Sequence, residues 1–290
     1  MLWITLSMKY TFSNKPLTHW SNSEITVWRI WHSTVVINLF GTWIITDPIF
    51  ANWFGIPVPG TAWNVWIKRL HKPALNIEQL PPIDILLLSH AHMDHLHPYS
   101  CEKIVKHSGG KTQVVVAPGV KRWLARWVQK QTTELDRGQV LSIDGVTVKA
   151  CEVNHRWARY PRVRDRARKH KNGASYNGYL LEKNQKYVFF GGDTAYTEVM
   201  KTYAPAWGVD LAIMPIGSYD PWIHVHCNPE QALEMAHMLH AKNIVWIHRD
   251  TWWRPAKQRE WDKPLRRIKK SAPTYWIEVL WEYEWEVISL

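Results

Sequence analysis

Short apolar or β-branched runs, each about as long as a single β-strand, recur along most of this chain. Most of them are bounded by Gly, Pro, Asn or Asp, residues that end strands and favour turns. The first three runs follow one another closely, as the strands of an antiparallel sheet do. The runs cover residues 24–30, 34–40, 42–47, 84–89, 113–118, 146–153, 176–182, 186–192, 210–215 and 243–248.

Helical segments separate the later runs. In the clearest of them, Asn228 is a favourable N-cap, Pro229 suits the first helical position, and Glu230 places negative charge at the positive end of the helix dipole. Strands interleaved with helices predict an α/β sandwich rather than an all-β barrel. The predicted helices cover residues 98–107, 120–129 and 228–241.

Length and composition favour a single globular unit. The chain has 290 residues, of which 46% are hydrophobic, and no shift in composition divides it, so we predict one domain over residues 1–290. No window of about 18 apolar residues predicts a transmembrane helix, and the first residues do not resemble a secretory signal. Three cysteines without a CxxC pair favour a reducing compartment, the cytoplasm. The net charge of +11 favours anionic partners.

One stretch, residues 35–67, contains a single charged residue, Asp47, among many apolar and tryptophan side chains. Pro57 and Gly60 prevent a continuous helix there. One interpretation is a pair of core strands followed by a loop that packs on the body. The other is that residues 49–67 form an apolar lip for a lipid-like substrate or a membrane surface.

The strongest chemical signal is the segment Ser-His-Ala-His-Met-Asp-His-Leu-His at residues 89–97. It follows an apolar run, so its side chains leave a predicted strand and enter a loop. Ligand-type residues this close together are able to converge on a metal ion, whereas buried histidines in a core lose water without gaining partners. Imidazole and carboxylate donors suit zinc, with iron or manganese as alternatives. The four ligand-type residues are His90, His92, Asp94 and His95.

Further ligands are expected at the ends of other strands, because four residues do not complete two metal sites. His155 and His248 each end an apolar run, and Asp193 follows another run in the sequence Gly-Gly-Asp-Thr. The two glycines permit a close approach of the backbone. These three residues are therefore the candidate distant ligands.

In order and approximate spacing, these residues resemble the metallo-β-lactamase-fold hydrolases over roughly residues 24–255. Within that superfamily the chain is similar to the branch that contains N-acylphosphatidylethanolamine-hydrolysing phospholipase D and ascorbate-6-phosphate lactonase. The likeness to this branch rests on Thr46-Asp47-Pro48, Phe190-Gly191-Gly192-Asp193-Thr194, Asn228-Pro229-Glu230-Gln231-Ala232 and Ile247-His248.

The resemblance implies a four-layer αββα sandwich, the metallo-β-lactamase fold, with two divalent metal ions at one edge. Zinc is the expected metal, and Mn²⁺ or Fe²⁺ are the alternatives. Two such ions activate a shared water to the attacking hydroxide, which makes Asp94 and Asp193 the catalytic residues. Asp47 would bond back to the histidine loop. By this resemblance the first ion is held by His90, His92 and His155, the second by Asp94, His95 and His248, and both by Asp193.

The expected substrate contacts lie beside the ligands. Residues 156–171 contain eight Lys or Arg, which are either a solvated charge run or, through Arg156 and Arg159, a clamp on a phosphate. His224 and His226 are either proton donors to a leaving group or polar loop residues. The chain departs from the branch at His97, where an acidic or polar residue is usual. It also departs after His248, where Arg249-Asp250-Thr251 replaces Trp-Gly-Thr.

The leading hypothesis is a metal-dependent hydrolase, specifically a phosphodiesterase that acts on a phospholipid or a small organophosphate. A lactonase or esterase would use the same metal site to attack a carbonyl carbon. A nuclease is disfavoured, because the basic residues gather in one loop, and a sensor protein would tend to lose ligands that this sequence retains. Peripheral contact with the inner face of the membrane is also expected of a basic, tryptophan-rich chain. The oligomeric state stays open.

Overall fold

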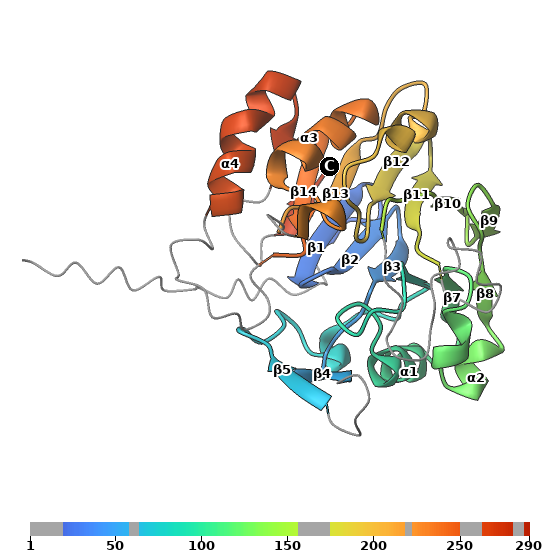
Figure 1. The fold of residues 1–290 in the computed structure, drawn as a ribbon. Helices are drawn as coiled ribbons and strands as arrows, with labels where there is room; N and C mark the ends of the chain where they lie inside the picture. The colour runs from blue at the N-terminus through green and yellow to red at the C-terminus, as the bar shows by residue number, and fades with distance from the viewer. Residues whose placement is uncertain (1–19, 58–63, 156–174, 218–221, 250–262, 281–286) are drawn as a thin grey trace, which may run out of the picture.

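Two seven-stranded β-sheets form the centre of the protein in the computed structural model, which describes residues 20–57, 64–155, 175–217, 222–249, 263–280 and 287–290 (Figure 1). The first sheet has the strand order β16-β1-β2-β3-β6-β7-β8, and the second has the order β15-β14-β13-β12-β11-β10-β9. A separate antiparallel pair, β4 and β5, lies beside the first sheet (Figure 1).

The strands correspond closely to the apolar runs of the sequence. The first sheet contains β1 (Ile25–Trp31), β2 (Thr34–Leu39), β3 (Thr42–Thr46), β6 (Ile85–Leu88), β7 (Gln113–Val116), β8 (Thr132–Glu134) and β16 (Val287–Ser289). The second contains β9 (Val140–Ile143), β10 (Val146–Cys151), β11 (Gly178–Lys183), β12 (Lys186–Phe190), β13 (Leu211–Pro215), β14 (Asn243–Ile247) and β15 (Glu278–Val279). The separate pair is β4 (Trp53–Pro57) and β5 (Asn64–Lys68).

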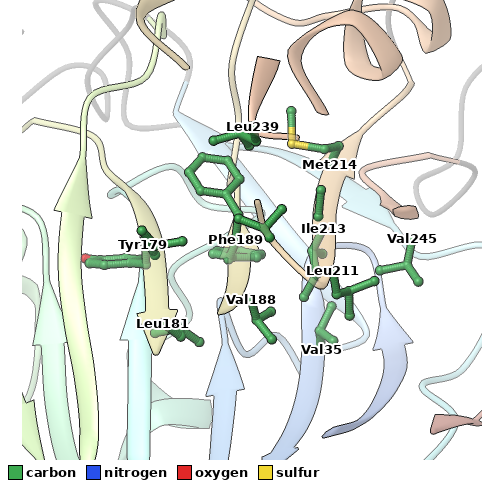
Figure 2. Close-up of a cluster of buried hydrophobic side chains, with 14 of the residues drawn as sticks. Val35, Tyr179, Leu181, Val188, Phe189, Leu211, Ile213, Met214, Leu239 and Val245 are labelled. Carbon is green, nitrogen blue, oxygen red and sulfur yellow. The ribbon is translucent and has the colours of Figure 1, made fainter. Parts of the chain in front are cut away.

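Both faces of the first sheet are apolar, which explains why its strands appear as continuous hydrophobic runs. Side chains alternate between the faces, so Ile85 and Leu87 of β6 belong to one buried cluster and Leu86 and Leu88 to another. The first of these clusters also contains the inner face of the second sheet. Figure 2 shows part of it, in which Val35 of the first sheet joins Val188 and Leu211 of the second.

Helices cover the outer faces of the two sheets (Figure 1). The helix α1 (Pro98–His107) buries Cys101, Ile104 and Val105 against the first sheet. The helices α3 (Pro229–Met238) and α4 (Lys263–Ser271) bury Leu233 and Ile268 in the core of the second. The order helix, sheet, sheet, helix confirms the predicted αββα sandwich. The remaining helical segments are α2 (Arg126–Gln129) and the short 3₁₀ helices Ile77–Gln79, Lys121–Trp123, Glu198–Tyr203, Trp222–His224 and Ala272–Tyr275.

The helix predictions are correct in two places and wrong in one. Residues 98–107 and most of 228–241 are helical, and Asn228 caps α3 by accepting the backbone N–H of Gln231. The continuous helix predicted over 120–129 is wrong, because Leu124 has an extended backbone and its buried side chain packs on the first sheet. None of the described helices is long and apolar enough to cross a membrane.

The apolar stretch 35–67 also differs from its predicted form. After the core strands β2 and β3, the chain forms the β4–β5 pair where a loop was expected. Ile67 in β5 packs against the core of the first sheet, whereas Trp53 at the start of β4 is 47% exposed. The described part of residues 49–67 thus combines residues that pack on the core, Ile49, Phe50 and Ile67, with an exposed tryptophan.

The directions of the strands bring the candidate metal ligands to one edge of each sheet. In the first sheet β1, β3 and β6 run in the same direction, and in the second sheet β10, β12, β13 and β14 do so. Residues that directly follow these strands therefore meet at the same edge of each sheet. They include the histidine loop after β6, His155 after β10, Asp193 after β12 and His248 after β14.

Gly192 allows the two sheets to approach each other closely at this edge. Its φ of +55° is left-handed, and a Cβ atom added there would lie 2.7 Å from the Cβ atom of Ser89. Ser89 directly precedes His90, so a residue without a side chain lets the Asp193 loop reach the histidine loop.

We therefore expect Gly192→Ala to lower the free energy of unfolding by about 2 kcal/mol or more, because it adds a steric clash to left-handed backbone strain. Urea denaturation measures the loss. Gly110→Ala is the matched control, since Gly110 has a φ of +76° and no atom lies within 4 Å of an added Cβ. Equal losses in the two variants would contradict the close approach.

Candidate metal centre

The carboxylate of Asp193 lies at the centre of a cluster of imidazoles and is 2% exposed. Its Oδ2 atom lies 3.1 Å from Nε2 of His95 and 3.2 Å from Nε2 of His248. Nitrogen atoms at 3.6, 3.8 and 4.0 Å from the same oxygen belong to His226, His90 and His155. One buried carboxylate thus faces imidazoles from four separate parts of the chain.

Four overlapping groups of donor atoms meet at this place, and the atoms in each group lie within 4.8 Å of one another; the two smaller groups are Asp47, His90 and His95, and Asp193, His226 and His248, and the two larger groups have four residues each. All seven residues that the sequence predicts as metal ligands belong to the two larger groups. The first of these comprises His90, His92, His155 and Asp193, and the second comprises His32, Asp94, His95 and His248.

The donor atoms fit a bound metal ion. Although they are buried, Nε2 of His90, His95 and His248 and both oxygens of Asp193 have no hydrogen-bond partner among the described residues. Buried polar atoms are nearly always paired, so this concentration of unpaired donor atoms indicates a cation between them. Imidazole nitrogen and carboxylate oxygen together suit zinc, iron or manganese.

Asp47, at the end of β3, orients the histidine loop. Its carboxylate accepts hydrogen bonds from the backbone N–H and the hydroxyl of Ser89 at 2.7 and 2.6 Å. Its Oδ2 atom also lies 2.7 Å from Nδ1 of His95. Because an ionised carboxylate only accepts hydrogen bonds, Nδ1 of His95 carries the proton and Nε2 keeps its lone pair for a metal.

The same logic assigns the proton in two further histidines. The Ser89 hydroxyl already donates to Asp47, so it accepts from Nδ1 of His90 at 2.8 Å. Nδ1 of His155 donates to the carbonyl oxygen of Val225 at 2.8 Å. In both residues Nε2 keeps its lone pair and faces Asp193, and Nε2 of His155 also lies 3.2 Å from Nδ1 of His92.

Burial favours the neutral form of four imidazoles at the site, whereas the Asp193 carboxylate raises the pKa of His95 and of His248 in spite of their burial. Burial holds the pKa of His90 and His155 well below the usual value, and it lowers the pKa of His32 to about 3 and that of His226 to about 4. Neutral imidazole is the form that binds metal ions. Burial opposes ionisation of Asp193, but the nearby His248 and His95 outweigh it and hold its pKa well below the usual range.

Of the predicted substrate contacts, the structure describes the two histidines but not the two arginines. Arg156 and Arg159 lie outside the described residues. His226 lies inside the cluster, and its ring stacks on His248 with the centroids 4.8 Å apart. His224 is exposed and belongs to none of the ligand groups found among the described residues. His97 accepts the backbone N–H of Ser100 and so caps α1, which gives this departure from the branch a structural role.

His32 is the member of the ligand groups that the sequence analysis missed. It lies in the turn between β1 and β2, and its Nε2 atom is 3.3 Å from Oδ2 of Asp94. The available signal was its position directly after an apolar run, the same position that identified His155 and His248.

The chain belongs to the metallo-β-lactamase superfamily of metal-dependent hydrolases. The family model described as "Beta-lactamase superfamily domain" matches residues 42–249, which include every predicted ligand.

Two relatives match most of the chain. An uncharacterised protein of Mycobacterium tuberculosis is 28% identical over 86% of this chain and 64% of its own length. N-acyl-phosphatidylethanolamine-hydrolyzing phospholipase D 1 of Caenorhabditis elegans is 27% identical over 80% of this chain and 66% of its own length. The chain thus spans just under two thirds of each of these relatives.

A solved structure supports the fold. The structure of a "possible metal-dependent hydrolase" from Veillonella parvula has a TM-score of 0.68 and 17% identity, and the match covers 92% of this chain and 100% of that chain. At this identity the likeness concerns the fold alone.

We expect Asp47→Asn to weaken metal binding about 10- to 100-fold, because it disturbs the proton position and orientation of His95. Competition with a chromophoric chelator measures the affinity. The matched control is Asp84→Asn, since Asp84 accepts the backbone N–H of Trp43 at the opposite end of β6. A similar loss in the control would attribute the effect to general destabilisation.

Proposed function

We propose that the protein is a metal-dependent phosphodiesterase with a dinuclear centre, and that it acts on an N-acylphosphatidylethanolamine-like phospholipid or a small organophosphate. The observation that carries the proposal is the position of Asp193, whose carboxylate belongs to one of the two larger ligand groups and lies within 3.2 Å of two nitrogens of the other. A bridging carboxylate of this kind is what keeps two like-charged ions close together.

The ligands divide between two ions. His90, His92 and His155 would hold the first ion, Asp94, His95 and His248 would hold the second, and Asp193 would contribute to both. When bound, two divalent ions supply an activated water as the nucleophile and stabilise charge on the entering and leaving oxygens. Zinc, manganese and iron all suit these donors.

His226 is placed to assist the leaving group. Its Nδ1 atom is buried, lies 3.6 Å from Oδ2 of Asp193, and has no hydrogen-bond partner among the described residues. A neutral imidazole carries one N–H, which at this edge is able to donate a hydrogen bond to a departing oxygen. Arg156, next to His155 in the sequence, then binds the non-bridging phosphate oxygens.

The choice of a phospholipid draws on the named relative. The Caenorhabditis elegans relative, which is named as a phospholipase D, is 27% identical to this chain across 80% of its residues. The net charge of +11 adds support over an unphosphorylated lactone, because a phosphodiester is anionic and such a lactone is neutral.

Asp193→Ala is expected to reduce hydrolysis of bis-p-nitrophenyl phosphate at least about 10³-fold, because it removes the ligand that both ions share. The assay compares manganese- and zinc-loaded proteins, with metal content determined in each. Asp136→Asn, which changes an exposed carboxylate outside the cluster, should retain full activity. Undiminished turnover by the Asp193 variant would contradict the mechanism, and turnover of p-nitrophenyl esters or lactones alone would replace the phosphodiester.

We also propose that the β4–β5 pair contacts the membrane in which such a substrate lies. Trp53 is 47% exposed, and the Lys68 ammonium lies 5.4 Å from the centre of its ring. The Phe50 backbone N–H donates to the hydroxyl of Ser100 at 3.0 Å, which ties the start of this segment to α1 and the histidine loop. An exposed tryptophan beside a cation suits an anionic lipid surface.

Trp53→Ala should therefore reduce co-sedimentation with phosphatidylserine-containing vesicles severalfold, because the indole no longer enters the interface. The control is Trp207→Ala, which removes an indole that is 85% exposed at the edge of the second sheet opposite the metal ligands. Unchanged binding by the Trp53 variant, or an equal loss in both variants, would count against this surface.

A further inference from the structure

His32 is buried against the candidate metal centre although the seven-ligand pattern does not include it. Its side chain is 3% exposed. Its Nε2 atom lies 3.3 Å from Oδ2 of Asp94, and its ring lies 4.4 Å from that of His248 and 5.2 Å from that of His95. His32 thus faces the three residues that the proposed function assigns to the second ion alone.

The distance between His32 and Asp94 resembles that between two ligands of one ion. The hydrogen bond between Nδ1 of His95 and Asp47 is 2.7 Å, as expected for a charge-assisted bond. The nitrogens of His95 and His248 that share the second ion with Asp193 lie 3.1 and 3.2 Å from its oxygen. Two donor atoms that are each about 2.1 Å from one ion lie about 3.0–3.4 Å apart. The 3.3 Å distance between Nε2 of His32 and Oδ2 of Asp94 therefore matches the separation of two ligands of one ion rather than a charge-assisted hydrogen bond.

The backbone fixes His32 in this position. Its φ of 45° is left-handed, and so is that of His248 at 58°. The carbonyl oxygen of His32 accepts the backbone N–H of His248 at 3.3 Å, and the carbonyl oxygen of Ser33 accepts the Thr46 hydroxyl at 2.8 Å. A left-handed backbone conformation costs a non-glycine residue about 1–3 kcal/mol, and it persists only where the surrounding contacts hold the residue in place.

We propose that Nε2 of His32 is an additional ligand of the second metal ion, an inference that rests on the dinuclear centre proposed above. The second ion would then have three imidazole and two carboxylate donors, which would leave one of six positions for water. A six-coordinate set of nitrogen and oxygen donors suits Mn²⁺ or Fe²⁺ better than Zn²⁺, which favours four ligands. The five side chains are those of His32, Asp94, His95, Asp193 and His248.

The test compares metal binding by the wild-type protein, His32→Ala and His32→Gln. Metal-free protein is titrated with Mn²⁺ against a chelator, which gives the number of bound ions and the affinity of each. Glutamine keeps a side-chain N–H for Asp94 but is a poor metal ligand. We expect both variants to bind the first ion normally and to lose at least about tenfold in affinity for the second. Normal binding of the first ion also reports an intact fold.

Cobalt substitution tests the wild-type protein without any variant. Addition of the second Co²⁺ should produce the weak visible absorption of a six-coordinate ion, whereas the intense absorption of a four-coordinate ion would overturn the proposal. His237→Ala is the matched control, because His237 is an exposed histidine on α3, and it should bind both ions.

Two results would separate the hypotheses. Wild-type affinity for the second ion in His32→Gln would overturn ligation by His32 and leave it only a hydrogen bond to Asp94. Binding of a single ion by the wild-type protein would contradict the dinuclear centre itself.

Discussion

The buried carboxylate of Asp193 is the feature on which the arrangement of both sheets depends. Its two oxygens have no hydrogen-bond partner in the described part of the chain and are almost wholly removed from water, so a cation has to balance their charge. That cation also requires donors from the other sheet, and the histidine loop after β6 provides them. The close approach of Gly192 to Ser89 and the hydrogen bonds of Asp47 to the histidine loop hold the two loops next to each other. The sandwich is thus a scaffold in which six strands, three from each sheet, end at one site.

Most of this centre was predictable because its ligands obey a local rule. Each of His155, Asp193 and His248 comes at or within a few residues of the end of an apolar run, and co-directional strands place such residues at one edge. The four ligands at residues 89–97 are close in sequence, so no knowledge of long-range packing is needed to group them. The glycines before Asp193 were also informative, since their lack of side chains is what the close approach requires.

Other features depend on contacts that no local pattern records. His32 obeys the same rule, but its partner Asp94 is 62 positions away, and a single histidine in a turn has many structural explanations. The helix α4 has few apolar positions, and it is held through a bidentate ion pair between Arg267 and Glu230 of α3. The helix predicted over residues 120–129 breaks because burial of Leu124 outweighs local helical preference. In each case tertiary packing decides the outcome.

The charge of the centre bears on the substrate independently of any relative. The pKa values of Asp94 and Asp193 are held well below the usual range, so both carboxylates are ionised; burial raises the pKa of Asp47, which the hydrogen bonds from His95 and Ser89 oppose. At the proposed dinuclear centre, two divalent ions would outweigh the negative charges of Asp94 and Asp193, because imidazoles bind metal ions in their neutral form. Low exposure to water strengthens the attraction of the remaining positive charge for an anion. If the centre is the proposed dinuclear one, a phosphodiester gains electrostatic binding energy there that a neutral lactone or ester does not.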